Sequence, residues 1–172
     1  MNIPEIVARN ARLYPNEKAL VDTNPGKNIR EEITWKEFDE RINKVANALI
    51  DRGIKQGDKV SQIMYNSTRF LEIFLGILRS GAWAAPLSFR LTSDEIEYCN
   101  SISEAKLLFL GEEFEEKIQV VRRRSTSVKD YIFLGKSTPE GMEDYEDFLS
   151  SAQSDTVEIE MKDEDGAALY FT

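Results

Sequence analysis

The chain has 172 residues, of which 41% are hydrophobic, and its 31 acidic and 22 basic residues give a net charge of −9. These values are ordinary for one globular domain, and the acidic balance disfavours nucleic-acid binding, because a phosphate backbone requires a basic surface. The chain contains no histidine, which excludes Ser-His-Asp triads and histidine-ligated metals from this segment.

The first part of the chain predicts a helix followed by a β-hairpin. Residues Ile3–Tyr14 have a helical pattern, with Pro4 tolerated in the first turn. Two strand candidates, Lys18–Asp22 and Arg30–Thr34, flank the residues Asn24–Lys27, whose composition favours a turn. We therefore expect these two strands to pair as a hairpin.

A capping box opens the next helix, because Thr34 and Glu37 have the spacing at which two side chains satisfy free backbone amides. Apolar residues then recur at helical spacing as far as Leu49, and the pattern ends at Gly53, a natural left-handed cap. The following segment, GIKQGDK, superficially resembles a glycine-rich loop. Its spacing differs from GxxxxGK[ST] and it follows a helix, which favours a helix cap and a turn into a strand.

From residue 59 onward, strand and helix patterns alternate. The expected strands are Lys59–Met64, Ala82–Leu87, Lys106–Leu110, Tyr131–Leu134 and Gly166–Phe171, and the expected helices are Ser67–Ser80, Thr92–Ser101, Glu112–Val121 and Tyr145–Ala152. Residues 82–87 and 166–171 are continuous apolar runs, typical of buried strands, whereas 135–164 is irregular and expected to lie mostly on the surface. The alternation predicts an α/β fold, with a mostly parallel sheet flanked by helices and the small N-terminal β-hairpin.

Few residues are candidates for chemistry. Runs of neighbouring carboxylates cannot form the facing pair that a glycosidase needs, and no calcium-loop spacing occurs. Cys99 is interpreted as a core residue, Arg122–Arg124 as a solvated helix end, and Asp58 and Lys59 as solvated side chains. The residues themselves therefore assign no catalytic group and no metal ligand.

The sequence also bears on location. The N-terminus lacks the apolar region of a signal peptide, and no apolar run is long enough to span a membrane. The single cysteine fits a reducing compartment. We therefore expect a cytoplasmic protein without a transmembrane segment.

Three blocks of sequence resemble the adenylate-forming superfamily, which includes acyl-CoA synthetases, firefly luciferases and peptide-synthetase adenylation domains. The first contains Ile33–Phe38 (ITWKEF), similar to (L/I)TYxEL, and Gly53–Val60 (GIKQGDKV), similar to GVxxGDxV. The second contains Asn66-Ser67 and Phe74–Ala82 (FLGILRSGA), similar to N(S/C)…flGvlkaGa. The third, Ala168–Thr172 (ALYFT), resembles the strand that enters the signature loop SGTTGxPKG.

The resemblance implies that residues 1–172 are the first part of a large N-terminal AMP-binding domain, truncated at the start of its phosphate-binding loop. Thr172 would be the first residue of that loop and the only cofactor-binding residue here. The implied enzyme is an acyl-CoA ligase for a fatty or other carboxylic acid. It attacks the α-phosphorus of Mg²⁺-bound ATP with the carboxylate, and the thiol of coenzyme A then displaces AMP from the acyl-adenylate. The fragment alone is expected to be inactive and to bind no cofactor.

Two alternatives remain open at this point: a stand-alone α/β scaffold or interaction module, and an enzyme that adenylates an aryl acid or an amino acid. Ser88 stands where peptide-synthetase domains tend to have Asp, which favours an acyl- or aryl-CoA ligase. The expected partners are the remainder of the parent chain and a small-molecule carboxylic acid. Self-association through the exposed edge of the last strand is also expected, and nucleic acid is not.

Overall fold

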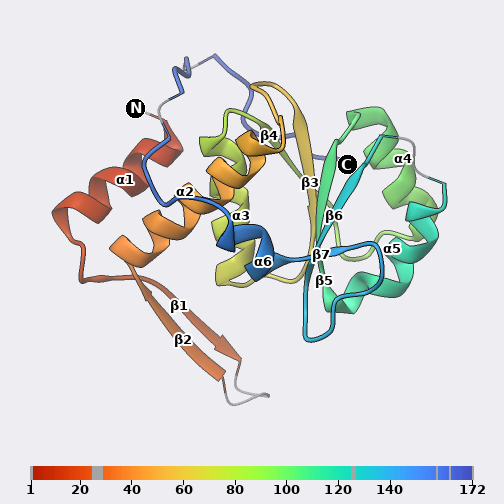
Figure 1. Ribbon diagram of the computed structural model, residues 1–172, viewed down its shortest axis with the longest axis horizontal. Helices are drawn as coiled ribbons and strands as arrows, with labels where there is room; N and C mark the ends of the chain where they lie inside the picture. Colours follow the sequence, from red (N-terminus) through yellow and green to blue (C-terminus); the bar gives the residue numbers. More distant parts are fainter. Residues whose placement is uncertain (1, 25–28, 125–126, 158, 163, 172) are drawn as a thin grey trace.

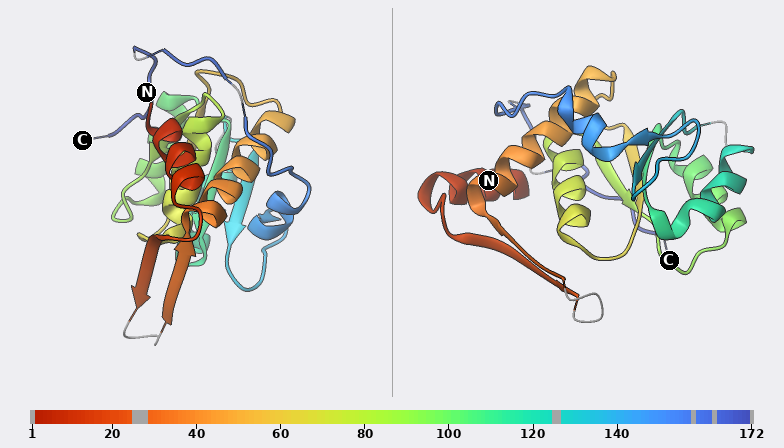
Figure 2. Two further views of the ribbon diagram at one scale, coloured as in Figure 1. Left: turned by 90° about the vertical axis from the view of Figure 1, so that its left-hand side faces the viewer. Right: turned by 60° about the horizontal axis from the view of Figure 1, so that its bottom comes forward.

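Helices lie on both faces of a five-stranded sheet, and a two-stranded hairpin extends away from it (Figure 1). The structure is a computed structural model that describes residues 2–24, 29–124, 127–157, 159–162 and 164–171. The hairpin extends from the body in the two further views as well (Figure 2). Its turn, expected at Asn24–Lys27, falls mainly on residues outside the described ranges.

The elements, in chain order, are α1 (Ile3–Leu13), β1 (Lys18–Asn24), β2 (Ile29–Thr34), α2 (Trp35–Asp51), β3 (Lys59–Ile63), α3 (Thr68–Arg79), β4 (Trp83–Pro86), α4 (Ser93–Ser103), β5 (Leu107–Gly111), the 3-10 turn η2 (Glu112–Phe114), α5 (Glu115–Arg122), β6 (Asp130–Leu134), β7 (Glu143–Asp144) and α6 (Tyr145–Ser150). The sheet has the order β4-β3-β5-β6-β7 and all of its pairs are parallel, while β1 and β2 pair antiparallel. The predicted α/β class, parallel sheet and hairpin are thus confirmed.

Local sequence signals set several helix ends. The Thr34 hydroxyl oxygen accepts a hydrogen bond from the Glu37 amide at 3.3 Å, and the Glu37 carboxylate accepts one from the Thr34 amide at 2.9 Å. Hydrogen bonds from the backbone and then the hydroxyl of Thr34 lower the pKa of Glu37 below its ordinary value. Gly53, just past the end of α2, has a φ of +79°, as a left-handed cap requires.

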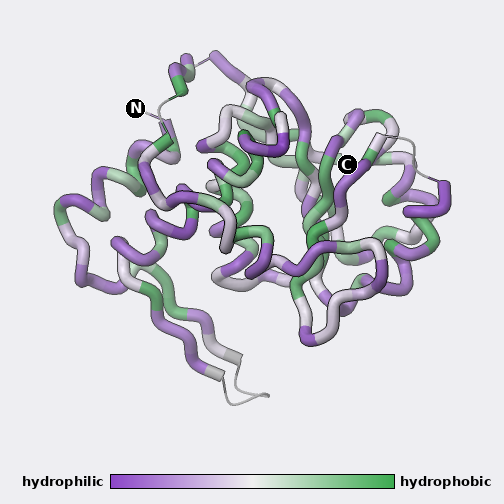
Figure 3. The backbone as a smooth tube through the Cα atoms, viewed as in Figure 1, coloured by the Kyte–Doolittle hydropathy of each residue, from purple (hydrophilic) through white to green (hydrophobic). Residues whose placement is uncertain are grey.

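The sheet separates two apolar cores, one on each face. One core contains residues from α2, α3 and α6, including Ile42, Ile73 and Phe148. The other contains residues from α4 and α5, including Ile96 and Ile118. Hydrophobic residues concentrate accordingly on the strands and on the helix sides that face them (Figure 3). Burial of both faces explains why the strands are continuous apolar runs.

Two expectations for the C-terminal third are wrong. Residues 166–171 do not form a buried strand: they make one isolated bridge, between Ala168 and Ala84, and Tyr170 is 66% exposed. The segment has a neighbour on one side only at this bridge, so no ladder develops among the described residues. Residues 135–164 are not mostly surface either, because Tyr145, Phe148 and Leu149 of α6 are buried in the core.

Strand β3 carries two polar side chains, Ser61 and Gln62, which are both fully buried. The Ser61 hydroxyl donates a hydrogen bond to Asn100 Oδ1 at 2.7 Å. The amide oxygen and nitrogen of Gln62 have no hydrogen-bond partner among the described residues. Adjacent positions of one strand therefore hold a satisfied and an unsatisfied polar group.

We expect replacement of Gln62 by methionine to stabilise the protein by about 1–2 kcal/mol, because it removes an unpaired buried amide at similar volume. Replacement of Ser61 by alanine should instead destabilise by about 1 kcal/mol, because it leaves Asn100 without its donor. Urea unfolding of the two variants measures both changes. A loss of stability in Gln62→Met equal to that in Ser61→Ala would contradict the interpretation.

Candidate functional site

The carboxyl ends of the parallel strands meet at one edge of the sheet, and the strand order reverses there. The chain passes from β3 to β4 on one side, and then to β5 on the other side of β3. In open α/β sheets, ligands bind in the crevice outside the strand ends at such a reversal. Gly111 lets the two strand ends approach, because a Cβ at this position would lie 3.2 Å from Met64 Cβ and 2.7 Å from Glu113 Oε2.

Three aromatic side chains gather at this crevice. The ring of Tyr65 lies 5.5 Å from that of Phe89 and 5.3 Å from that of Phe114, measured between centroids. Tyr65 is 51% exposed and Phe89 47% exposed. The Lys117 ammonium donates to the Leu91 carbonyl at 2.8 Å and so ties the loop after β4 to α5. The result is a half-exposed apolar surface that could pack against a planar or apolar group.

The helix N-termini nearest this edge are satisfied by the protein's own side chains. Ser67 Oγ accepts from the Phe70 amide at 3.1 Å, and Asp22 Oδ2 accepts from the Thr68 amide at 3.2 Å. At α4, Thr92 and Glu95 form a capping box, and hydrogen bonds from Thr92 lower the pKa of Glu95. A phosphate group would have to displace these contacts, so the described residues do not form a phosphate cradle.

The segment 166–171 lies beside β4. The Ala84 amide donates to the Ala167 carbonyl at 3.0 Å, and the Leu169 amide donates to the Ala84 carbonyl at 2.8 Å. Gly166 packs on Trp83, where a Cβ would overlap the indole ring. The bridge is parallel, so the segment runs toward the carboxyl edge of the sheet. Thr172, the predicted first residue of the phosphate-binding loop, lies outside the described residues.

Cys99 and the basic run have the structural roles that the sequence predicts. Cys99 is buried in α4, and burial, with a smaller contribution from the charge of Glu95, raises the pKa of its thiol. In the basic run, Arg122 donates to the Glu140 carbonyl at 3.0 Å, and Arg124 forms an exposed ion pair with Asp94. Neither feature belongs to the crevice.

Asp58 differs from its expectation as a solvated side chain. Only 17% of its side chain is exposed, and its carboxylate lies 2.7 Å from Lys106 Nζ. Partial burial raises the pKa of Asp58, but hydrogen bonds from Lys106 and the Lys55 backbone outweigh it and give a net lowering. Lys59 Nζ lies 5.5 Å from the Trp83 ring centroid, so it too is partnered. Both residues fix the turn before β3.

A buried ionic cluster on the α2–α3–α6 side was missed by sequence reasoning. Glu72 is fully buried and accepts from Arg41 Nε at 2.8 Å, from Arg69 Nη1 at 3.0 Å and from the Tyr145 hydroxyl. Burial, then the charge of Glu72, raises the pKa of Tyr145, which keeps its hydroxyl a donor. A glutamate inside the most apolar helix was the available signal.

Two wider classes of site find no support in the described part of the chain. No group of three acidic, histidine or cysteine side chains there could hold a metal ion. No helix there has the length and apolar character that crossing a bilayer requires.

Comparison with known proteins finds similarity along almost the whole chain. The model of the family described as AMP-binding enzyme matches residues 7–172. The long-chain-fatty-acid–CoA ligase FadD13 of Mycobacterium tuberculosis is 27% identical over 99% of this chain, which spans 32% of that ligase. A 3-hydroxybenzoate–CoA/4-hydroxybenzoate–CoA ligase of Thauera aromatica is 31% identical over 62% of this chain and 20% of its own length. The crystal structure of the N-terminal domain of FACL13 from Mycobacterium tuberculosis superposes with a TM-score of 0.84 at 26% identity, covering 98% of this chain and 41% of that domain.

Proposed function

This chain belongs to the family of AMP-binding enzymes, and from that membership we propose that it is the first part of the large N-terminal domain of an ATP-dependent carboxylic acid–CoA ligase. The observation that carries the proposal is the family match over residues 7–172. The likeness to an N-terminal domain structure over 98% of the chain supports it. The chain spans about a third of FadD13 (32%), so the activity of a whole ligase is proposed for the protein that contains it.

Family membership implies the use of ATP and CoA, and we add Mg²⁺ as the metal that accompanies ATP. The described residues do not fit these groups by themselves, because the helix N-termini at the carboxyl edge are already capped. We therefore derive no reaction step from them. Their contribution is scaffolding: the bonds of Ala84 and the packing of Gly166 on Trp83 hold the segment that leads into Thr172.

For the substrate we propose a fatty acid, because the 27% identity to FadD13 extends over 99% of this chain. An aryl acid is the second candidate, favoured by the 31% identity to the hydroxybenzoate ligase over 62% of the chain. The stand-alone module and amino-acid adenylation have no comparable relative among these. We propose a cytoplasmic location for the ligase.

The test is ATP–pyrophosphate exchange by the gene product that contains this chain. We expect exchange only when a carboxylic acid is added, with aliphatic acids more active than hydroxybenzoates or amino acids, and acyl-CoA formation when CoA is present. The isolated 172-residue chain should show no saturable heat with Mg²⁺-ATP at millimolar concentration in isothermal titration. Absence of exchange by the folded gene product with every acid tested would refute the ligase proposal. Saturable binding by the isolated chain would refute its incompleteness.

The outer edge of β4 is only partly covered by residues 166–171. We propose that this edge lets the isolated chain self-associate, because unpaired strand edges are templates for pairing with another chain. Sedimentation of the isolated chain at increasing concentration would then show a growing dimer fraction, and a constant monomer mass would exclude it.

A further inference from the structure

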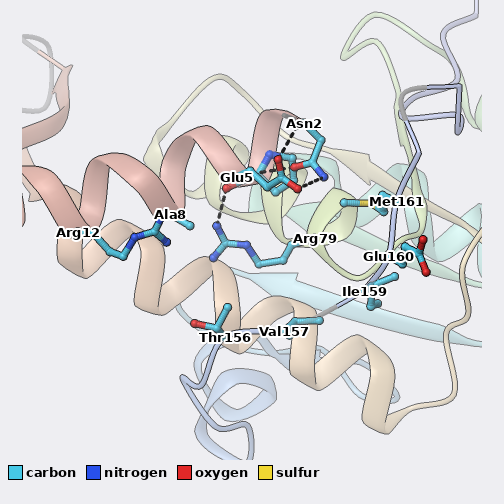
Figure 4. A pocket seen from close by; sticks show the side chains of 11 residues that line it. Asn2, Glu5, Ala8, Arg12, Arg79, Thr156, Val157, Ile159, Glu160 and Met161 are labelled. Atoms are coloured by element: carbon cyan, nitrogen blue, oxygen red, sulfur yellow. Dashed lines mark hydrogen bonds between the residues drawn. The ribbon is translucent and has the colours of Figure 1, made fainter.

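A cavity of about 510 Å³ lies between α1, the end of α3 and the extended segment 156–161 (Figure 4). Arg79, at the end of α3, lines this cavity and precedes the start of β4 by four positions. The cavity therefore lies at the amino-terminal edge of the parallel sheet. The crevice described above lies at the carboxyl edge, so the two are separate places.

The walls of the cavity are largely apolar and follow α1. Pro4 and Ala8 line it from the helix, and Val157, Ile159 and Met161 line it from the extended segment. A second cavity of about 350 Å³ shares Asn2, Pro4 and Met161 with the first and is also lined by Ile3, Ile6, Leu78 and Ala82. We call the two cavities together the α1 trough. From Pro4 to Arg12 the helix rises about 12 Å, at about 1.5 Å per residue, which suits an elongated ligand.

Two arginines converge on the first cavity. Arg79 is 4% exposed and fixed: its guanidinium pairs with Asp39 at 2.8 Å, and Nη2 donates to the Pro4 carbonyl at 3.0 Å. Arg12 forms no hydrogen bond or ion pair with any described residue. In Figure 4 its guanidinium extends toward that of Arg79. An unpaired cation that faces a second cation favours a bound anion, preferably one able to accept two parallel hydrogen bonds.

Two glutamates in the lining limit the charge of that anion. Glu5 is engaged in the N-terminal cap of α1, where it accepts from the Asn2 amide at 3.0 Å and from Asn2 Nδ2 at 3.1 Å. Glu160 extends away from Arg79 in Figure 4. Their negative charge disfavours a nucleotide or diphosphate more strongly than a singly charged group. Apolar walls, one unpaired arginine and an elongated shape together fit a carboxylate with an alkyl chain.

We propose that the α1 trough binds a medium-chain fatty carboxylate, with the carboxylate at Arg12 and the alkyl chain along Ala8, Ile159 and Met161. The trough is remote from the carboxyl edge, so this is a second acid-binding site and not the site of adenylation. The inference concerns this chain alone and does not depend on the proposed reaction.

The test is isothermal titration of the 172-residue chain with octanoate and with 1-octanol, both below their aggregation limits. We expect saturable binding of one octanoate per chain, and binding of octanol weaker by about tenfold or more, because the alcohol lacks the charge that pairs with Arg12. Absence of saturable octanoate binding, or equal affinity for the alcohol, overturns the proposal.

Three variants locate the site. Arg12→Gln should weaken octanoate binding by about tenfold and leave octanol binding unchanged. Arg9→Gln, an exposed residue of the same helix that does not line the trough, should bind octanoate like the unchanged chain. Ala8→Phe should abolish binding of both ligands by filling the cavity. Thermal unfolding checks that each variant is folded, and equal octanoate affinity in Arg12→Gln and Arg9→Gln overturns the assignment whether or not Ala8→Phe folds.

Discussion

Replacement of Glu72 by alanine is expected to destabilise the protein by about 3 kcal/mol or more, because it leaves charges without their buried partner. Glu72 is fully buried, whereas the side chains of Arg41 and Arg69 are 25% and 29% exposed. Burial lowers the pKa of Arg41, but hydrogen bonds to Glu72 and Glu146 outweigh it, so the pKa is raised and the guanidinium stays charged. The variant also leaves the buried Tyr145 hydroxyl without its acceptor, which adds to the cost.

Urea unfolding measures this change, with Glu40→Ala as the matched control. Glu40 forms an exposed pair with Lys36 at 3.9 Å on the surface of α2, and such pairs contribute about 0–1 kcal/mol. The cluster joins α2, α3 and α6, so the loss in Glu72→Ala should be global and not confined to one helix. A loss no larger than that of Glu40→Ala would show that the cluster is not a stabilising element.

Replacement of Gly76 by alanine is the second change with a large expected effect. Gly76 lies in α3 where α3 crosses α2, and a Cβ there would overlap Cβ and Cγ1 of Val45 and lie 3.2 Å from the Ile42 carbonyl. A Cβ atom cannot rotate away, so the two helices must separate, at a cost of about 1–3 kcal/mol. The higher helix propensity of alanine returns about 1 kcal/mol of this. We expect a net loss of stability, measured by urea unfolding.

The double variant Gly76→Ala/Val45→Ala separates these two contributions. Val45→Ala alone creates a cavity and destabilises, because Val45 is fully buried. In its presence the new Cβ at residue 76 has room, so Gly76→Ala should become neutral or stabilising. The coupling between the two positions is then favourable in a double-mutant cycle. Additive losses would show that the helix crossing does not depend on a glycine.

Particular elements show how far sequence patterns reach. The capping boxes at Thr34 and Thr92 predict the starts of α2 and α4, because a cap depends only on residues three positions apart. The three ordered blocks point to the family, which the match over residues 7–172 then shows. Strand β7 has two residues and no sequence pattern, since only its pairing with β6 defines it. The apolar run 166–171 predicts a buried strand, but burial depends on neighbours that its own sequence does not contain.

The sequence by itself determined the α/β class, most helices and strands, and membership of the AMP-binding enzymes. These follow from short-range periodicity, caps and motif order. The tertiary structure alone decided which side chains meet across the fold. It brought Glu72 to Arg41 and Tyr145, placed Gly76 against Val45, and set Arg12 opposite Arg79 beside the α1 trough. These contacts join residues more than thirty positions apart, and the packing of helices onto the sheet, rather than any local spacing, determines them.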